Sequence, residues 1–231
     1  MNVDTVGLGD GLSQVGDVLS TAGIPPSKLG AARSSRLSEP ERHLYFWILR
    51  RFAAGGRPSN AETRHAAGEL GLDAESALGT FATQELVHLD RSGEIDVAYP
   101  FSGRPTAHRV RFPSGHEAYA MCAIDALGIA PMLGEPIEIA SRDPLTDEDI
   151  HVELEPGGTG SWQPEQAVVV AGRAGDSESC DACCPVLNFF ASTTNAERWL
   201  AAHPEVQGMV ISMEDAIVAG RAVFSDILKE A

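Results

Sequence analysis

Four cysteines and one aspartate are the residues of this sequence whose types and spacing point to chemistry. AMCAIDALG places Cys122 three residues before Asp125, and CDACCPVLNFF holds Cys180, Cys183 and Cys184. A spacing of i, i+3 puts two side chains on one face of a helix, so Cys122 and Asp125 are expected to lie in contact. A thiolate binds soft metals, and a carboxyl beside it can hold and release a proton.

Two opposing effects on the pKa of the Cys122 thiol are expected. The positive end of a helix dipole lowers a thiol pKa, whereas the Asp125 carboxylate raises it because like charges repel. The two groups would then titrate as a pair that shares a proton. Such a pair suits proton delivery, in which the thiolate binds a metal and the carboxyl carries the proton.

The ligand set argues against a structural zinc site, which needs four ligands. Cys180 and Cys183 have the Cys-x-x-Cys spacing, but the sequence holds no second pair. Some of these cysteines would instead be small buried apolar residues if they had no chemical role. A linear two-thiolate site fits better, so the residues alone predict a site for a soft metal or a soft electrophile.

Composition points to a globular cytoplasmic protein. The chain has 231 residues, of which 43% are hydrophobic and 22% are charged. No apolar run approaches the roughly 18 residues of a membrane span, and the N-terminus lacks the basic start and apolar segment of a secretory signal. We therefore expect no membrane partner, and we expect reducing conditions to keep the cysteines as free thiols.

The net charge of −16 divides the chain into two different parts. Residues 31–111 carry eleven Lys/Arg against ten Asp/Glu, whereas residues 112–231 carry five against twenty. The change near residue 112 indicates a boundary. We therefore expect an N-terminal arm at 1–30, one domain at 31–112 and a second domain at 113–231.

The first domain is expected to be winged-helix-like. Three helices should begin at the caps Ser38, Ser59 and Asp73, and the strands 94–101 and 107–112 should follow as a hairpin. The third helix, residues 73–90, contains no Lys or Arg. A DNA-reading helix normally needs basic groups for phosphates and bases, so no nucleic-acid partner is expected.

The second domain is expected to contain a mixed, mostly antiparallel sheet with helices, which makes the fold α+β. Strands are predicted at 136–143, 150–157 and 166–175, and a strand and long helix over 208–231. A helix after Cys122 should break at Gly128 and Pro131, and Asn195 should cap an amphipathic helix. The seven histidines show no metal-ligand pairing and are expected at the surface or the edge of the core.

Two motifs together carry a resemblance to a known family. AMCAIDALG followed by CCPVLNFFAS resembles the organomercurial lyases, and YPFSGRPTAHRVRF and MLGEPIEIASRDPLT are similar to the same family. The resemblance covers about residues 35–228. It implies an N-terminal winged-helix-like part that does not read DNA, joined to an α+β catalytic domain.

The resemblance also implies an activity in mercury resistance: cleavage of a carbon–mercury bond by protonolysis, which yields a hydrocarbon and Hg(II). The catalytic roles fall on Cys122, Asp125 and Cys184, and the mercury ligands would be these three and Cys183. No organic cofactor is implied. External low-molecular-weight thiols, or a mercuric reductase, would remove the Hg(II) product.

Other classes of protein fit the same residues. A soft-metal-binding thiol protein, or a metal-responsive winged-helix regulator, would bind metal reversibly without breaking a bond. A member of the family could also act on another electrophile. The proximity of an acidic proton carrier to Cys122 favours proton transfer over storage.

Overall fold

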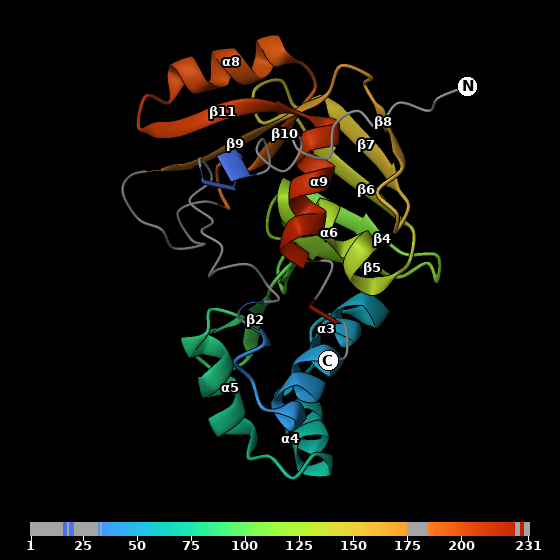
Figure 1. Ribbon diagram of the computed structural model, residues 1–231, viewed down its shortest axis with the longest axis vertical. Helices are drawn as coiled ribbons and strands as arrows, with labels where there is room; N and C mark the ends of the chain where they lie inside the picture. Colours follow the sequence, from blue (N-terminus) through green and yellow to red (C-terminus); the bar gives the residue numbers. More distant parts are fainter. Residues whose placement is uncertain are drawn as a thin grey trace, which may run out of the picture.

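The computed structural model describes residues 16–17, 19–20, 32, 34–174, 184–224 and 227–228 of the chain (Figure 1). Most of the predicted N-terminal arm therefore lies outside the described residues, as do Cys180 and Cys183. Within the described ranges, no helix combines the length and apolar character that a membrane crossing requires.

Three helices lie at one end of the molecule (Figure 1): α3 (Glu39–Gly55), α4 (Asn60–Glu69) and α5 (Ala74–Thr83). Each begins directly after its predicted cap: Ser38, Ser59 and Asp73. The Glu62 carboxylate completes the second cap by accepting a hydrogen bond from the Ser59 N–H at 2.8 Å. The third helix is shorter than predicted, because the chain enters strand β1 (Val87–Leu89) soon after it.

An eight-stranded sheet occupies the middle of the described chain, and every strand pair in it is antiparallel. The spatial order is β1-β2-β3-β5-β4-β6-β7-β8. The strands after β1 are β2 (Ile95–Ala98), β3 (Phe101–Ser102), β4 (His108–Arg111), β5 (Glu117–Ala120), β6 (Ile137–Arg142), β7 (Asp149–Leu154) and β8 (Gly160–Gln163). The predicted α+β class with a mostly antiparallel sheet is confirmed, and the winged-helix assignment stays a prediction.

The predicted hairpin between residues 94–101 and 107–112 is wrong. β2 pairs with β1 and β3, whereas β4 pairs with β5 and β6. Alternating polar and apolar residues predict that a segment is a strand, but they do not choose its partner. As a result the sheet continues across residue 112, and one hydrophobic cluster includes both Phe52 of α3 and Ile139 of β6.

A second, three-stranded antiparallel sheet has the order β10-β9-β11 and carries α8 on one face (Figure 1). Its elements are β9 (Val168–Ala174), β10 (Asn188–Phe190), α8 (Thr193–Ala202) and β11 (Val206–Ser212). The prediction that Asn195 caps α8 is wrong. Ser192 is the cap, and its hydroxyl accepts a hydrogen bond from the Asn195 N–H at 3.2 Å.

Helices α6 (Ala123–Leu133) and α9 (Met213–Phe224) pack against each other through two glycines. The predicted break at Gly128 and Pro131 is wrong, because α6 continues through both. A Cβ on Gly220 would lie 2.9 Å from the Gly128 nitrogen and 3.0 Å from the Ile124 carbonyl oxygen. Gly128 therefore lets the backbone of α9 approach closely, and it does not end the helix.

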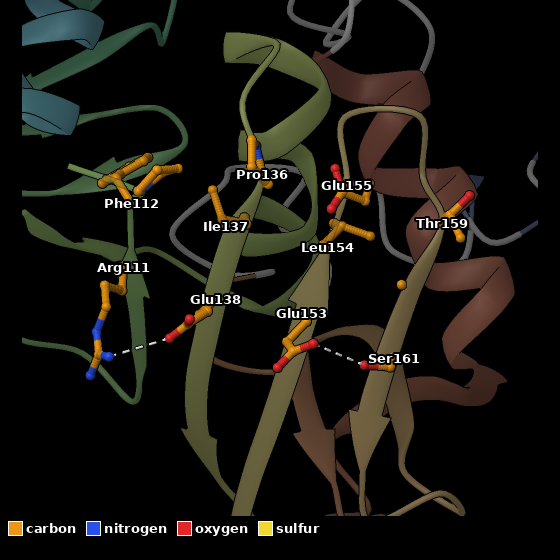
Figure 2. A pocket seen from close by; sticks show the side chains of 12 residues that line it. Arg111, Phe112, Pro136, Ile137, Glu138, Glu153, Leu154, Glu155, Thr159 and Ser161 are labelled. Atoms are coloured by element: carbon orange, nitrogen blue, oxygen red, sulfur yellow. Dashed lines mark hydrogen bonds and ion pairs between the residues drawn. The ribbon is translucent and has the colours of Figure 1, made fainter. Parts of the chain in front are cut away.

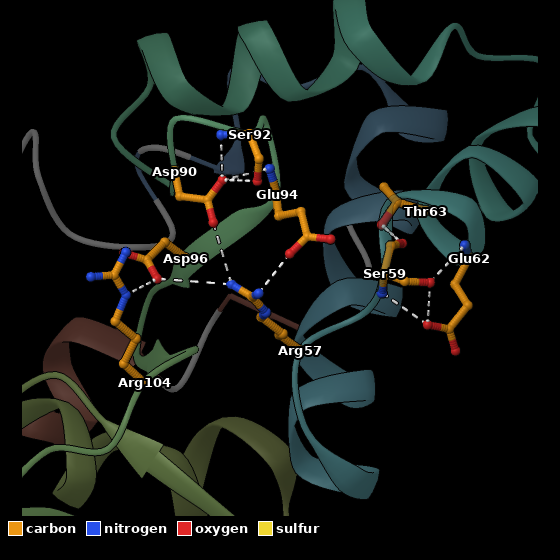
Figure 3. Close-up of polar contacts among 9 residues, drawn as sticks. All are labelled: Arg57, Ser59, Glu62, Thr63, Asp90, Ser92, Glu94, Asp96 and Arg104. Atoms are coloured by element: carbon orange, nitrogen blue, oxygen red, sulfur yellow. Dashed lines mark hydrogen bonds and ion pairs between the residues drawn. The ribbon is translucent and has the colours of Figure 1, made fainter.

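Arg57, in the connection between α3 and α4, joins the helical end to the sheet (Figure 3). Its guanidinium lies 2.6 Å from Glu94 Oε2 and 3.7 Å from Asp90 Oδ2. Arg104 donates to Asp96 Oδ1 at 2.7 Å beside this group. These side chains are partly exposed, so each pair adds little free energy. Arg57 thereby contacts both the turn between β1 and β2 and strand β2 itself.

Asp143 links the two sheets. It lies in the turn after β6, and its side chain is buried. Its Oδ2 accepts hydrogen bonds from the Ala191 N–H and from Asn195 Nδ2, both at 2.8 Å, while Oδ1 accepts from the Leu145 N–H at 2.7 Å. A buried carboxylate with several N–H donors is well satisfied, so the turn after β6 is held against the segment that follows β10.

The close approach of α6 and α9 gives a stability prediction. Gly220→Ala should lower the free energy of unfolding by about 1–3 kcal/mol, because the new methyl group meets backbone atoms that cannot rotate away. Gly79→Ala is the matched control at an exposed position of α5, where an added Cβ meets no atom within 4 Å. The control should gain about 0.5–1 kcal/mol from helix propensity. Urea unfolding measures both, and equal shifts would contradict the packing argument.

Candidate active site: two thiols and one carboxyl

Cys122 is the cap residue of α6. The chain leaves β5 at Ala120, and Cys122 keeps extended backbone angles, with φ at −154°, before the helix begins. The Cys122 sulfur accepts a hydrogen bond from the Asp125 N–H at 3.4 Å, and the thiol donates to Asp125 Oδ2 at 3.1 Å. The expected contact between these two side chains is therefore present, and its cause is the cap geometry.

Cys184 reaches the same place from a distant part of the chain. Its thiol lies 3.8 Å from Asp125 Oδ2. The segment that follows it is fixed to α6, because the Ala123 N–H donates to the Leu187 carbonyl oxygen at 2.9 Å. One ligand atom from each of the three side chains lies within 4.8 Å of the others. Cys183, the fourth predicted ligand, lies outside the described residues.

All three side chains are buried: Cys122 is 1% exposed, Asp125 6% and Cys184 9%. Burial raises the pKa of the Cys122 thiol well above its usual range. The hydrogen bond with Cys184 and the charge of Asp125 raise it further, and the Asp125 N–H lowers it by less. The thiol therefore keeps its proton at neutral pH until another positive charge arrives.

The arrangement suits a soft cation with few ligands. Two sulfurs and a carboxyl fall short of the four ligands of a structural zinc site. Among the described residues, no other group of three Cys, His, Asp or Glu side chains meets in this way. The site can therefore offer two soft ligands and one proton carrier to the same metal.

His108 departs from the expectation that the histidines lie at the surface or the edge of the core. It lies on β4 and is 2% exposed. Burial lowers its pKa to about 4, so the ring is neutral at neutral pH. Its Nδ1 lies 3.0 Å from the Ser141 hydroxyl, and its ring meets Phe189 edge-on at 5.6 Å between centroids. The alternation of AHRVRF could have predicted the burial of His108, because it places this residue on the same strand face as the apolar Val110.

A groove of about 630 Å³ lies elsewhere, across strands β4, β6, β7 and β8 of the large sheet (Figure 2). Glu138 and Glu153 stand on neighbouring strands there, and Arg111 forms an ion pair with Glu138 at 3.4 Å. No cysteine lines this groove. Its side chains offer hard oxygen atoms, so its chemistry differs from that of the thiol cluster.

The raised pKa of Cys122 gives a pH prediction. An unfolded thiol, with a pKa of about 8.5, loses its proton at a pH where the folded protein still holds it. The free energy of unfolding should therefore fall above about pH 8.5, by up to about 1.4 kcal/mol per pH unit from this group. Cys122→Ser should remove this contribution to the slope of the free energy of unfolding against pH. Urea unfolding between about pH 7 and about pH 10 measures both proteins, and equal slopes would contradict the prediction.

Several known proteins are similar to this chain in sequence or in fold. Residues 101–225 match the family model described as alkylmercury lyase. The alkylmercury lyase of Staphylococcus epidermidis is 31% identical over 84% of this chain and 89% of its own length, and that of Bacillus cereus is 32% identical over 76% and 79%. The crystal structure of the mercury-bound form of MerB2 has a TM-score of 0.70 and 19% identity, covering 91% of this chain and 100% of that chain. The chain belongs to the alkylmercury lyase family.

Proposed function

We propose that Cys122, Asp125 and Cys184 form the site at which this alkylmercury lyase cleaves the carbon–mercury bond of an organomercurial. The observation that carries the proposal is the convergence of three buried side chains, from two distant segments, to within 4.8 Å. Mercury is a soft ion that prefers sulfur ligands, and the reaction needs one proton for carbon. Two thiols and a carboxyl supply both.

Binding begins as a ligand exchange at mercury. The organomercurial arrives with an external thiolate, and Cys122 replaces it. The Cys122 proton leaves with the departing thiolate, so that charge and atoms balance. Because burial raises the pKa of the free thiol, the positive charge of mercury is what makes the Cys122 thiolate stable in this site.

Cleavage follows when Cys184 becomes the second sulfur ligand. The Cys184 proton passes through the Asp125 carboxyl to the carbon atom, which keeps the electron pair of the broken carbon–mercury bond and leaves as a hydrocarbon. Oδ2 of Asp125 lies 3.1 Å from one sulfur and 3.8 Å from the other, so one oxygen atom can exchange protons with both thiols. Mercury stays divalent, and the step uses no redox partner or organic cofactor.

Release is a second ligand exchange. Two external low-molecular-weight thiols take Hg(II) from the two sulfurs and return their protons to Cys122 and Cys184. A mercuric reductase with available thiols would serve as an alternative acceptor. Cys183 stays a predicted additional ligand that stands next to Cys184 in the sequence.

Benzene release from phenylmercury with excess thiol tests the assignment. Cys122→Ser, Cys184→Ser and Asp125→Asn should each lower kcat/KM by at least about 10²-fold, since each removes a mercury ligand or the proton carrier. Asp149→Asn is the matched control, because this carboxylate is exposed and pairs with Arg142 at 3.3 Å on the surface. The control should keep the wild-type rate.

Three outcomes would contradict the proposal in different ways. An active Cys184→Ser enzyme beside an inactive Cys183→Ser enzyme would move the second thiol by one residue. Tight Hg(II) binding without benzene release by the wild-type protein would favour a soft-metal-binding protein. Full activity of Asp125→Asn would require another proton carrier.

A further inference from the structure

We propose that His108 and Asn188 are positioning residues that hold the Cys184 sulfur within reach of Asp125. This inference rests on the proposed function, in which Cys184 is the second mercury ligand. Among the described residues, neither side chain contacts the ligand atoms of Cys122, Asp125 or Cys184. They act through the short turn that follows Cys184.

Asn188 closes that turn. Its Nδ2 donates a hydrogen bond of 2.8 Å to the carbonyl oxygen of Pro185, the residue directly after Cys184. Asn188 itself begins β10, whose Phe189 and Phe190 are fully buried. The bond therefore connects the backbone next to the thiol to a strand that cannot move freely.

His108 packs against the strand that begins at Asn188. A hydrogen bond with Asn188 raises the pKa of His108, against the larger lowering by burial. The His108 ring also meets Phe189, the neighbour of Asn188 on β10, edge-on at 5.6 Å between ring centroids. Its Nδ1 lies 3.0 Å from the Ser141 hydroxyl on β6. The ring is thereby held between β6 and β10.

The far end of the turn is fixed separately, through the bond from the Ala123 N–H to the Leu187 carbonyl oxygen. Residues 184–187 thus have one anchor beside Cys122 and a second anchor on β10 through Asn188. Only the second anchor acts at Pro185, next to the sulfur-bearing residue. Loss of Asn188 should free Cys184 while the contact between Cys122 and Asp125 stays intact.

The step that depends on this anchor is the arrival of the second sulfur. Cys122 alone can capture the substrate, but bond cleavage needs mercury, Cys184 and Asp125 together. A displacement of about 1 Å in a reacting group can lower a rate by about 10²-fold. Asn188→Ala should therefore lower kcat for benzene release by about 10- to 100-fold and leave KM for phenylmercury near the wild-type value.

Asn195→Ala is the matched control. Its side-chain amide also donates a bond of 2.8 Å, but to Asp143 in the turn after β6, and a longer bond of 3.5 Å to Thr146 Oγ1. It should lower the melting temperature about as much as Asn188→Ala and keep the wild-type kcat. Equal activity losses in the two variants, or a wild-type kcat in Asn188→Ala, would overturn the inference.

A second measurement does not need turnover. Each protein is loaded with Hg(II) alone, and its transfer to dithiothreitol is followed by the thiolate-to-mercury absorption. Asn188→Ala should release Hg(II) at least about tenfold faster than the wild type and Asn195→Ala, because one of two sulfurs is held less well. Equal release rates in all three proteins would overturn the inference. A wild-type protein that binds Hg(II) on two sulfurs yet frees no benzene would contradict the proposed function only.

His108→Phe tests whether the two residues act as one unit. If they do, the double variant His108→Phe/Asn188→Ala should lose no more kcat than Asn188→Ala alone. If the loss of kcat in the double variant equals the product of the two single losses, the residues act independently, which would contradict the inference that they act as one unit. Because His108 is buried, the comparison uses only the folded fraction, measured from the near-ultraviolet circular dichroism.

Discussion

The fixed position of helix α6 is the constraint on which the rest of the site depends. The cap of this helix is Cys122, its first turn carries Asp125, and the N–H of Ala123 holds the segment that brings Cys184. A displacement of α6 would disturb all of these contacts together. The helix cannot slide easily, because the Phe224 ring and the Gly220 backbone of α9 pack directly against Gly128.

Burial then sets the chemistry of the site. Burial disfavours the Cys122 thiolate because the charged form is poorly solvated there, and the neighbouring Asp125 carboxylate repels it. The sequence led us to weigh the helix dipole against the Asp125 charge, but burial is the largest cause that raises the pKa of Cys122. Protons therefore stay at the site until a metal cation displaces them. Mercury binding and proton transfer are coupled for this reason.

Local rules predicted much of the fold. The caps Ser38, Ser59 and Asp73 and most strands lie where the sequence placed them, because capping bonds and side-chain alternation involve near neighbours. The errors occur where a distant element decides. The hairpin prediction failed because β5 lies between β3 and β4, and the predicted break at Gly128 failed because α9 packs against that glycine.

The sequence by itself determined the spacing of Cys122 and Asp125 and, with CCPVLNFFAS, the family of the chain. It could do so because a cap and a residue three positions later meet in any helix. Only the tertiary structure decided that the Cys184 sulfur lies 3.8 Å from Asp125 Oδ2 and that His108 packs against Phe189. Those distances join separate segments, and they are set by how two sheets and two helices pack, which no local pattern encodes.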